Sequence, residues 1–171
     1  PIPLDFSSII NKFLKLTNKY GRLNVIKTNL PKKGVKLIEH PNVKFPFKNV
    51  KTTTLNKNKA PELQIMYSNE ELAFNKQPKI IMAHKMYGFP YIDKDGSYGI
   101  CSRDNYVIIN RDLKEMELIK EFLSNELILF VFETTRYRMR YLEKYVFEFI
   151  PDFCKIDDCH NMYDNNKVDK I

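Results

Sequence analysis

The spacing of apolar residues predicts helices near both ends of the chain, with strands between them. Apolar residues recur three and four positions apart over residues 9–16, and Gly21 is well placed to end that helix. This helix has one apolar stripe, so it is expected to pack on the domain or on a missing neighbour. Residues 113–123 show the same spacing, with Asp112 as an N-cap candidate and Glu115 at the capping-box position.

Two further helices are predicted in the last third of the chain. The run from Leu127 to Phe132 is apolar all round, which is typical of a buried helix. Another helix is predicted to include Tyr141 to Phe149, and Pro151 limits its end. Residues 152–171 are polar, acidic and aperiodic, so a loose tail is predicted there.

Between the first and second helices the pattern is that of short strands broken by proline and asparagine. Lys79–Ala83 is an apolar run that indicates a buried strand. Asp95-Gly96 lies between two β-like runs, residues 89–93 and 98–101, and favours the positive φ angles of a tight hairpin. Further strands are predicted at 23–26, 35–38, 43–45, 51–54, 62–67 and 106–109. The sequence therefore predicts an α+β fold, in which an N-terminal helix and two or three C-terminal helices accompany a twisted, mostly antiparallel sheet.

Positive charge is concentrated in the first part of the chain. Residues 1–100 hold 17 Lys and Arg against 7 Asp and Glu, a net charge of +10, and residues 101–171 hold 11 against 14, a net charge of −3. Nine lysines and one acidic residue, Glu39, fall between Lys27 and Lys59. Such a patch attracts polyanions, because each neutralised phosphate releases counterions. The alternative is a solvated face without a partner.

The composition indicates a folded domain from an intracellular protein. A hydrophobic content of 43%, with 12 Phe and 10 Tyr, is enough for one core. The longest apolar run is far shorter than the ~20 residues that span a bilayer, so no membrane association is expected. Three cysteines are a sparse, odd set, which favours a reducing compartment. The chain begins at Pro1, and we expect it to be excised from a larger protein.

Catalytic motifs are missing from the sequence. The five glycines are scattered, and there is no Cys-x-x-Cys pair, no nucleophile elbow and no pair of adjacent prolines. Cys154, Cys159 and His160 form a metal-like cluster beside Asp157 and Asp158. Structural zinc needs four ligands, and adjacent Cys and His rarely supply two of them, so the preferred interpretation is a metal-free tail.

Two segments carry side chains suited to DNA. Arg136, Arg138 and Arg140 are interleaved with tyrosines. Guanidinium groups match phosphate oxygens and guanine edges, and tyrosine rings can stack on bases. Ion pairs with nearby glutamates explain the same arginines equally well. Likewise, Lys85–Gly88 is either a loop that contacts DNA or a connector between strands.

The order of motifs after residue 77 points to a family. Pro78–Ile81 and the aromatic hairpin come first, Asn105–Ile108 follows, and later come Leu123-Ser124-Asn125-Glu126-Leu127 and a Tyr-Leu…Ile-Pro ending over Tyr141–Pro151. This order resembles the C-terminal specificity region, or target-recognition domain, of adenine-specific DNA methyltransferases of type IIG and related restriction–modification systems, including versions in large DNA viruses. The chain departs from the family's Leu-Asn-Ser-Lys-Leu-like helix in that Asn and Ser are exchanged and Glu replaces Lys.

The resemblance implies a parent protein in which an upstream methylase domain binds S-adenosylmethionine and performs catalysis. This chain lacks the family's catalytic Asn-Pro-Pro-Tyr/Phe motif, so we expect no cofactor and no activity in the isolated module. Its expected partners are double-stranded DNA and the methyltransferase domain of the parent. Its expected location is the cytoplasm, or a virus factory or virion if the source is viral.

We expect residues 22–151 to form the target-recognition-like domain, residues 1–21 a helix or linker from the parent protein, and residues 152–171 a flexible acidic tail. The expected DNA contacts are Lys44, Lys48, Lys51, Thr52, Thr53, Thr54, Lys85, Tyr87, Arg103, Arg136 and Arg138. Two other classes stay open. One is a protein-interaction domain of a multisubunit viral or bacterial complex, and the other is a degenerate nuclease or other DNA enzyme.

Overall fold

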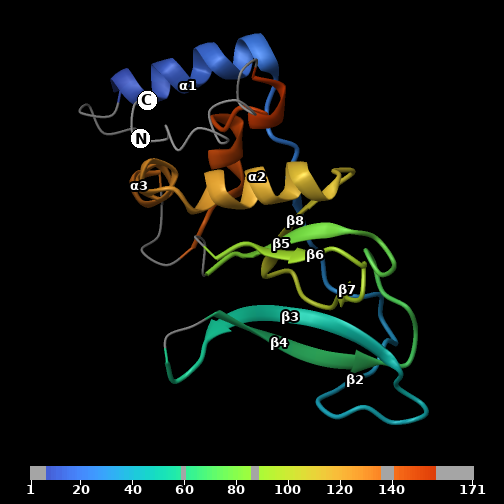
Figure 1. Ribbon diagram of the computed structural model, residues 1–171. Helices are drawn as coiled ribbons and strands as arrows, with labels where there is room; N and C mark the ends of the chain where they lie inside the picture. The colour runs from blue at the N-terminus through green and yellow to red at the C-terminus, as the bar shows by residue number, and fades with distance from the viewer. Residues whose placement is uncertain (1–6, 59–60, 86–88, 136–140, 157–171) are drawn as a thin grey trace.

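The computed structural model describes residues 7–58, 61–85, 89–135 and 141–156, whose helices and strands are stacked in layers (Figure 1). The helices are α1 (Ser7–Tyr20), α2 (Leu113–Ser124), α3 (Glu126–Thr134) and two short 3-10 helices, η2 (Lys144–Glu148) and η3 (Phe153–Lys155). The strands are β1 (Ile26–Lys27), β2 (Leu37–Ile38), β3 (Phe47–Leu55), β4 (Pro61–Ser68), β5 (Lys79–Ala83), β6 (Tyr91–Asp93), β7 (Gly99–Ile100) and β8 (Asn105–Ile109). The predicted α+β class is confirmed, including the N-terminal helix and the packed helices that follow the strands.

The described strands form two sheets rather than the single sheet that the sequence predicts. The first sheet has the order β1-β8-β5-β6 and is antiparallel throughout, and the second has the order β2-β4-β3-β7, with a parallel pairing of β3 and β7. In Figure 1 the first sheet lies between α2 and the second sheet, and α1 lies at the opposite end of the stack from β3 and β4. The second sheet therefore presents one face of the molecule.

The central strands β5 and β8 explain why two sheets form. On one side of the first sheet, Ile80, Met82 and Ile108 belong to the core beneath the helices. On the other side, Ile81 and Val107 belong to a smaller core between the two sheets. A strand that is apolar on both faces must be covered on both, and here the helices cover one face and the second sheet covers the other.

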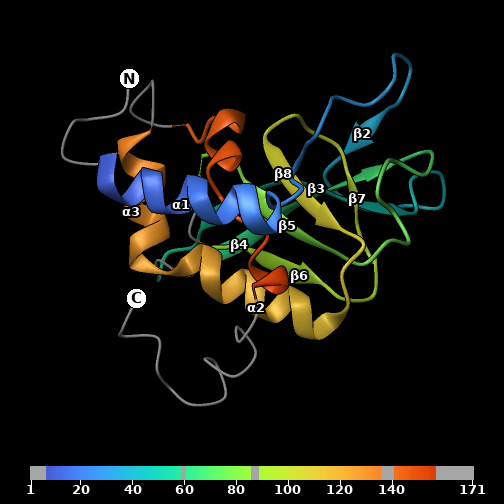
Figure 2. The same cartoon turned by 90° about the horizontal axis from the view of Figure 1, so that it is seen from above.

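Helices α1 and α2 are formed as predicted. Asp112 accepts a hydrogen bond from the Glu115 amide, and the Glu115 carboxylate accepts one from the Asp112 amide, so the capping box at the start of α2 is confirmed. Ile10 and Phe13 of α1 are buried in the same core as the apolar face of α2. Seen from above, α1 and α2 both lie over the strands (Figure 2). The apolar stripe of α1 is therefore used inside this domain.

The predicted hairpin around Asp95-Gly96 is wrong in its strand pairing. The turn is present, and Gly96 has a φ of +66°. However, β6 pairs with β5 in the first sheet, and β7 pairs with β3 in the second. The chain thus crosses between sheets over residues 94–98. Local turn chemistry fixes the turn, whereas the strand partners are fixed by the two cores.

Other elements are shorter or differently placed than predicted. The strand predicted at 23–26 is reduced to β1, and the one predicted at 43–45 is a turn with one isolated bridge, between Asn42 and Phe45. The helix predicted over Tyr141–Phe149 is only the 3-10 helix η2, Lys144–Glu148. Phe130 of α3 is 45% exposed, so α3 is not buried all round.

The start of the predicted loose tail is also ordered. Asp152 is buried and accepts a hydrogen bond from Arg111 at 2.7 Å, and the Phe153 ring stacks on Phe122 at 4.0 Å between centroids. Residues 152–156 thus pack against α2, and residues 157–171 lie outside the described part of the chain.

Candidate nucleic-acid interface

The predicted DNA-contacting lysines of the basic region lie on or beside the second sheet. Lys48 and Lys51 are exposed residues of β3, and Lys44 is exposed in the turn that precedes it. Lys48 and Lys51 are three residues apart, which corresponds to about 10 Å along a strand. None of the three forms an ion pair with another described residue. Their charges are therefore available to an anion.

A β-bulge places Lys51 in a special position on β3. Val50 pairs with Ile65 and Thr52 pairs with Gln64, which leaves Lys51 without an opposing residue on β4. A bulge bends a strand and redirects the extra side chain. Lys51 therefore sits at a local bend of the outer sheet, with its side chain exposed.

Thr52, Thr53 and Thr54 form the C-terminal half of β3, so the strand predicted at 51–54 is confirmed. Thr52 and Thr54 are half-buried, and they face Gln64 and Glu62 across the strand pair. Thr53 is only 3% exposed. A side chain buried this deeply does not reach the edge of a base in a DNA groove, so Thr53 is unsuited to the direct contact that the sequence suggested.

The connection between β7 and β8 brings other basic residues toward Lys51. The side-chain amide of Asn105 donates to the Lys51 carbonyl at 3.0 Å, and the backbone amide of His84 donates to the Asp104 carbonyl at 2.8 Å. Arg103, which is exposed, is thereby held between β3 and the end of β5, where Lys85 begins the next loop. We call Lys27, Lys51, Lys85 and Arg103 the basic edge.

Lys27 and Lys85 are assigned to the basic edge because both lie near aromatic rings around His84. The Lys27 ammonium lies 5.9 Å from the centroid of the Tyr106 ring, and that of Lys85 lies 5.4 Å from the centroid of Tyr141. Both cations act on His84, which stacks on Tyr141 with 5.0 Å between centroids. The predicted residues Lys51, Lys85 and Arg103 thus lie on chain segments that hydrogen-bond to one another. Lys44 lies in the turn before β3, and Tyr87, Arg136 and Arg138 lie outside the described residues.

His84 is a residue of this region that the sequence reasoning missed. Its Nε2 atom is buried and has no hydrogen-bond partner in the part of the chain that the structure describes. Burial lowers the pKa of His84 below its ordinary value of 6.5, and Lys27 and Lys85 lower it further, while Glu143 and Asp104 oppose the shift. The neutral imidazole is therefore the favoured form at pH 7.

We expect the stability of the fold to fall as the pH drops through 6.5. Because the pKa of His84 is lower in the folded state, the unfolded chain binds the proton first, and stability is lost from 6.5 down to the folded pKa. His84→Gln should remove this part of the pH dependence, measured by urea unfolding between pH 5 and 8. His40→Gln, at an exposed histidine, is the control. Parallel pH profiles for wild type and His84→Gln would contradict the assignment.

The described residues form no other evident site. No group of three or more His, Cys, Asp or Glu that could hold a metal ion occurs among them, and Cys159 and His160 lie outside that part of the chain. Cys154 packs at the edge of the helical core, and burial raises the pKa of its thiol to about 11. Within the described ranges, no helix is both long and apolar enough to cross a membrane.

Comparisons with known proteins add no family to this description. No family model, no curated protein and no solved structure matches the chain.

Proposed function

We propose that this chain is the DNA-binding, target-recognition module of a larger adenine-specific DNA methyltransferase or restriction–modification protein. The observation that carries the proposal is the basic edge, whose residues Lys51, Lys85 and Arg103 belong to three separate parts of the chain that hydrogen-bond to one another. Cations spaced along a rigid surface neutralise successive phosphates of a duplex. In this proposal catalysis and S-adenosylmethionine belong to a separate domain of the parent protein, which the resemblance of residues 78–153 supports.

The lysines of β3 extend this surface. Lys48 and Lys51 are exposed on the outer sheet without a described acidic partner, and Lys44 is exposed in the turn that precedes the strand. Contacts from such lysines go to the phosphate backbone and carry no sequence information. Any base selection therefore has to come from shorter-range contacts, for which Arg103 is the best-placed described residue.

The double variant Lys48→Glu/Lys51→Glu is expected to weaken binding to unrelated duplexes by a similar factor. Because two phosphate contacts are lost, the slope of log K against log salt should become shallower by about 2. Fluorescence anisotropy with labelled duplex, single-stranded DNA and RNA over a salt series measures both quantities. Unchanged affinity in the double variant would count against the proposal.

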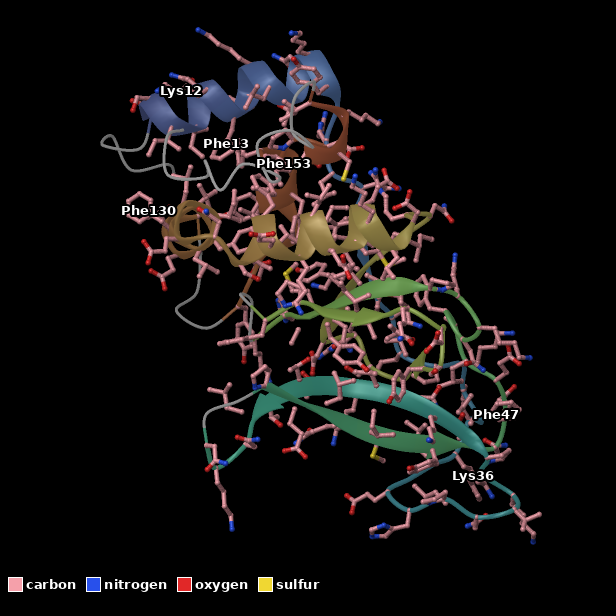
Figure 3. The ribbon with its side chains drawn as sticks, viewed as in Figure 1. Lys12, Phe13, Lys36, Phe47, Phe130 and Phe153 are labelled. Carbon is pink, nitrogen blue, oxygen red and sulfur yellow. The ribbon has the colours of Figure 1, made fainter. Side chains whose placement is uncertain are left out.

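Lys12 offers a control for the change of net charge. It is exposed on α1. Figure 3 shows it at the opposite end of the molecule from Phe47 of the second sheet and from Lys36 beside that sheet. Lys12→Glu combined with Lys15→Glu, which is also exposed on α1, makes the same change of four charge units as the double variant of β3. It should leave duplex affinity close to wild type if position rather than total charge determines binding.

The protein-interaction alternative loses its main support. The apolar stripe of α1 was the surface on which a partner protein could dock, and Ile10 and Phe13 of that stripe are buried in the domain's own core. Absence of nucleic-acid binding at low salt would nevertheless return this alternative to first place.

A further inference from the structure

Strand β4 has an outer edge that β2 covers only in part. On one side β4 pairs with β3 along its whole length, whereas on the other side β2 pairs only with Tyr67 and Ser68. Figure 1 shows the short β2 beside the end of β4. No loop among the described residues forms a backbone hydrogen bond with positions 62–66. We call residues 62–66 the open edge, because no described strand pairs with their outer side.

The hydrogen bonds of β3 determine which backbone groups of β4 point to the open edge. The Cys101 amide donates to the Val50 carbonyl at 3.1 Å, so the backbone groups of Val50 point toward β7 and away from β4. Val50 and Ile65 therefore form a non-hydrogen-bonded pair, in which the N–H and C=O of Ile65 point outward. The extra residue of the bulge belongs to β3, so β4 is regular and the same groups of Leu63 point outward too. Within the described ranges, Leu63 and Ile65 thus present donors and acceptors that no strand uses.

The side chains along the open edge alternate between the two faces of the sheet. Leu63 and Ile65 are half-buried and pack on the core between the two sheets, whereas Glu62 and Gln64 are exposed. Residues directly opposite each other on paired strands share a face, so a strand added here has to follow the same alternation. It fits with apolar residues opposite Leu63 and Ile65, a polar residue opposite Gln64 and a basic residue opposite the Glu62 carboxylate.

A cavity of about 290 Å³ adjoins the open edge at Leu63. Phe89 and Tyr91, from the segment that leads into β6, line it together with Leu63, and both rings are partly exposed. Glu62 and Lys120 contribute one charge of each sign to its walls. The cavity therefore suits an uncharged, apolar side chain, and the residue opposite Leu63 on an added strand lies within reach of it.

We propose that the open edge of β4 binds an extended segment of another protein, which adds to the second sheet as an antiparallel strand. In this mode of recognition main-chain hydrogen bonds give affinity, and pockets for alternate side chains give specificity. The segment bonds the outward groups of Leu63 and Ile65, places an apolar side chain in the cavity and sets a basic one opposite Glu62. This protein partner is additional to DNA, and the inference does not depend on the proposed function.

The test follows amide hydrogen exchange of the full chain by NMR, with the synthetic peptide Gly-Lys-Val-Thr-Val-Lys-Gly as the probe. In the free protein the amides of Leu63 and Ile65 should exchange much faster than the amide of Gln64, which points toward β3. Peptide at about ten times its Kd should slow the exchange of Leu63 and Ile65 by about 10-fold, because only the unbound fraction exchanges. The exchange of Gln64 should change far less.

Two matched controls isolate the strand pairing. The same peptide with both valines N-methylated keeps the side chains but lacks the donors, so it should give no protection. Glu62→Lys should weaken binding of the lysine-containing peptide by about 2- to 30-fold, because an attractive cross-strand pair becomes repulsive. Glu70→Lys makes the same change of charge at an exposed residue beyond the end of β4, and it should leave binding unchanged.

Each other outcome overturns the proposal in a different way. If peptide at millimolar concentration leaves the Leu63 and Ile65 amides unprotected, or if the N-methylated peptide protects them equally, strand addition is refuted. Slow exchange of both amides in the free protein at every concentration would mean that the chain's own residues cover the edge. Slowing that grows with protein concentration would mean that a second copy covers it. Duplex binding bears on none of these results, so the proposed function stands or falls separately.

Discussion

Asparagine in place of Asp93 is expected to lower the free energy of unfolding by about 3–5 kcal/mol, the cost of leaving one partner of a buried ion pair uncompensated. The Lys79 ammonium is completely buried and lies 2.5 Å from the Asp93 carboxylate, which is 3% exposed. Burial lowers the pKa of Lys79, and the hydrogen bond and charge of Asp93 raise it again. In the variant the ammonium keeps the carbonyls of Phe74 and Gln77 as acceptors but loses the opposite charge that compensates its burial.

Asp93 also organises the turn that follows it. Its carboxylate oxygens accept the backbone amides of Ser97 and Tyr98, at 2.8 and 3.1 Å. An asparagine side chain offers one oxygen where the carboxylate offers two, so at least one of these bonds is also weakened. The predicted loss therefore combines an unpaired charge with a loosened crossing between the sheets.

Urea unfolding at pH 7 measures the effect, and Asp95→Asn is the matched control. Asp95 is exposed two residues away, and surface substitutions of this kind usually change stability by no more than about 0.5 kcal/mol. Adding Lys79→Met to Asp93→Asn should recover part of the loss, because the buried charge disappears. A loss below about 1 kcal/mol for Asp93→Asn would show that the pair contributes little.

The sequence was most informative where a signal is local. The capping box of α2 needs only residues 112–115, and the apolar run of β5 shows by itself that both faces of that strand are buried. Turn chemistry was equally visible at Gly96. By contrast, the partner of β7 depends on whether Ile100 joins the core of one sheet or the other. That choice involves Val50 and Ile81, which are distant along the chain, so no local pattern could reveal it.

In the candidate site, too, local features could be predicted from the sequence and contacts between distant residues could not. Exposed lysines such as Lys48 were correctly expected at the surface, because charged side chains rarely lie buried. The proximity of Lys51 to Arg103 depends on hydrogen bonds that Asn105 and Cys101 make to β3, and no sequence pattern indicates these. His84 had a usable signal: it continues the alternation of Ile80 and Met82, which places it on the helical face of the first sheet.

Gly96→Ala is the second substitution expected to have a large effect, a loss of about 2–5 kcal/mol of stability. Gly96 has a φ of +66°, a conformation in which a Cβ atom is strained. A Cβ atom there would also lie 2.6 Å from the carbonyl carbon of Lys76 and even closer to the backbone of Gln77. These obstacles are backbone atoms, and the Lys76 amide bonds the Gly96 carbonyl at 2.8 Å. Neither side of the contact can move without breaking that bond.

Gly34→Ala separates the cost of backbone strain from the cost of steric overlap with the added Cβ atom. Gly34 also has a positive φ, +106°, but a Cβ atom there would meet nothing within 4 Å. It should therefore cost only the backbone strain, about 1–2 kcal/mol. The difference between the two alanine variants, measured by urea unfolding, reports the steric exclusion at Gly96 alone. Equal losses would mean that residues 76–77 yield readily. In that case the close approach of this segment to the 93–98 turn is not what holds the crossing between the two sheets in place.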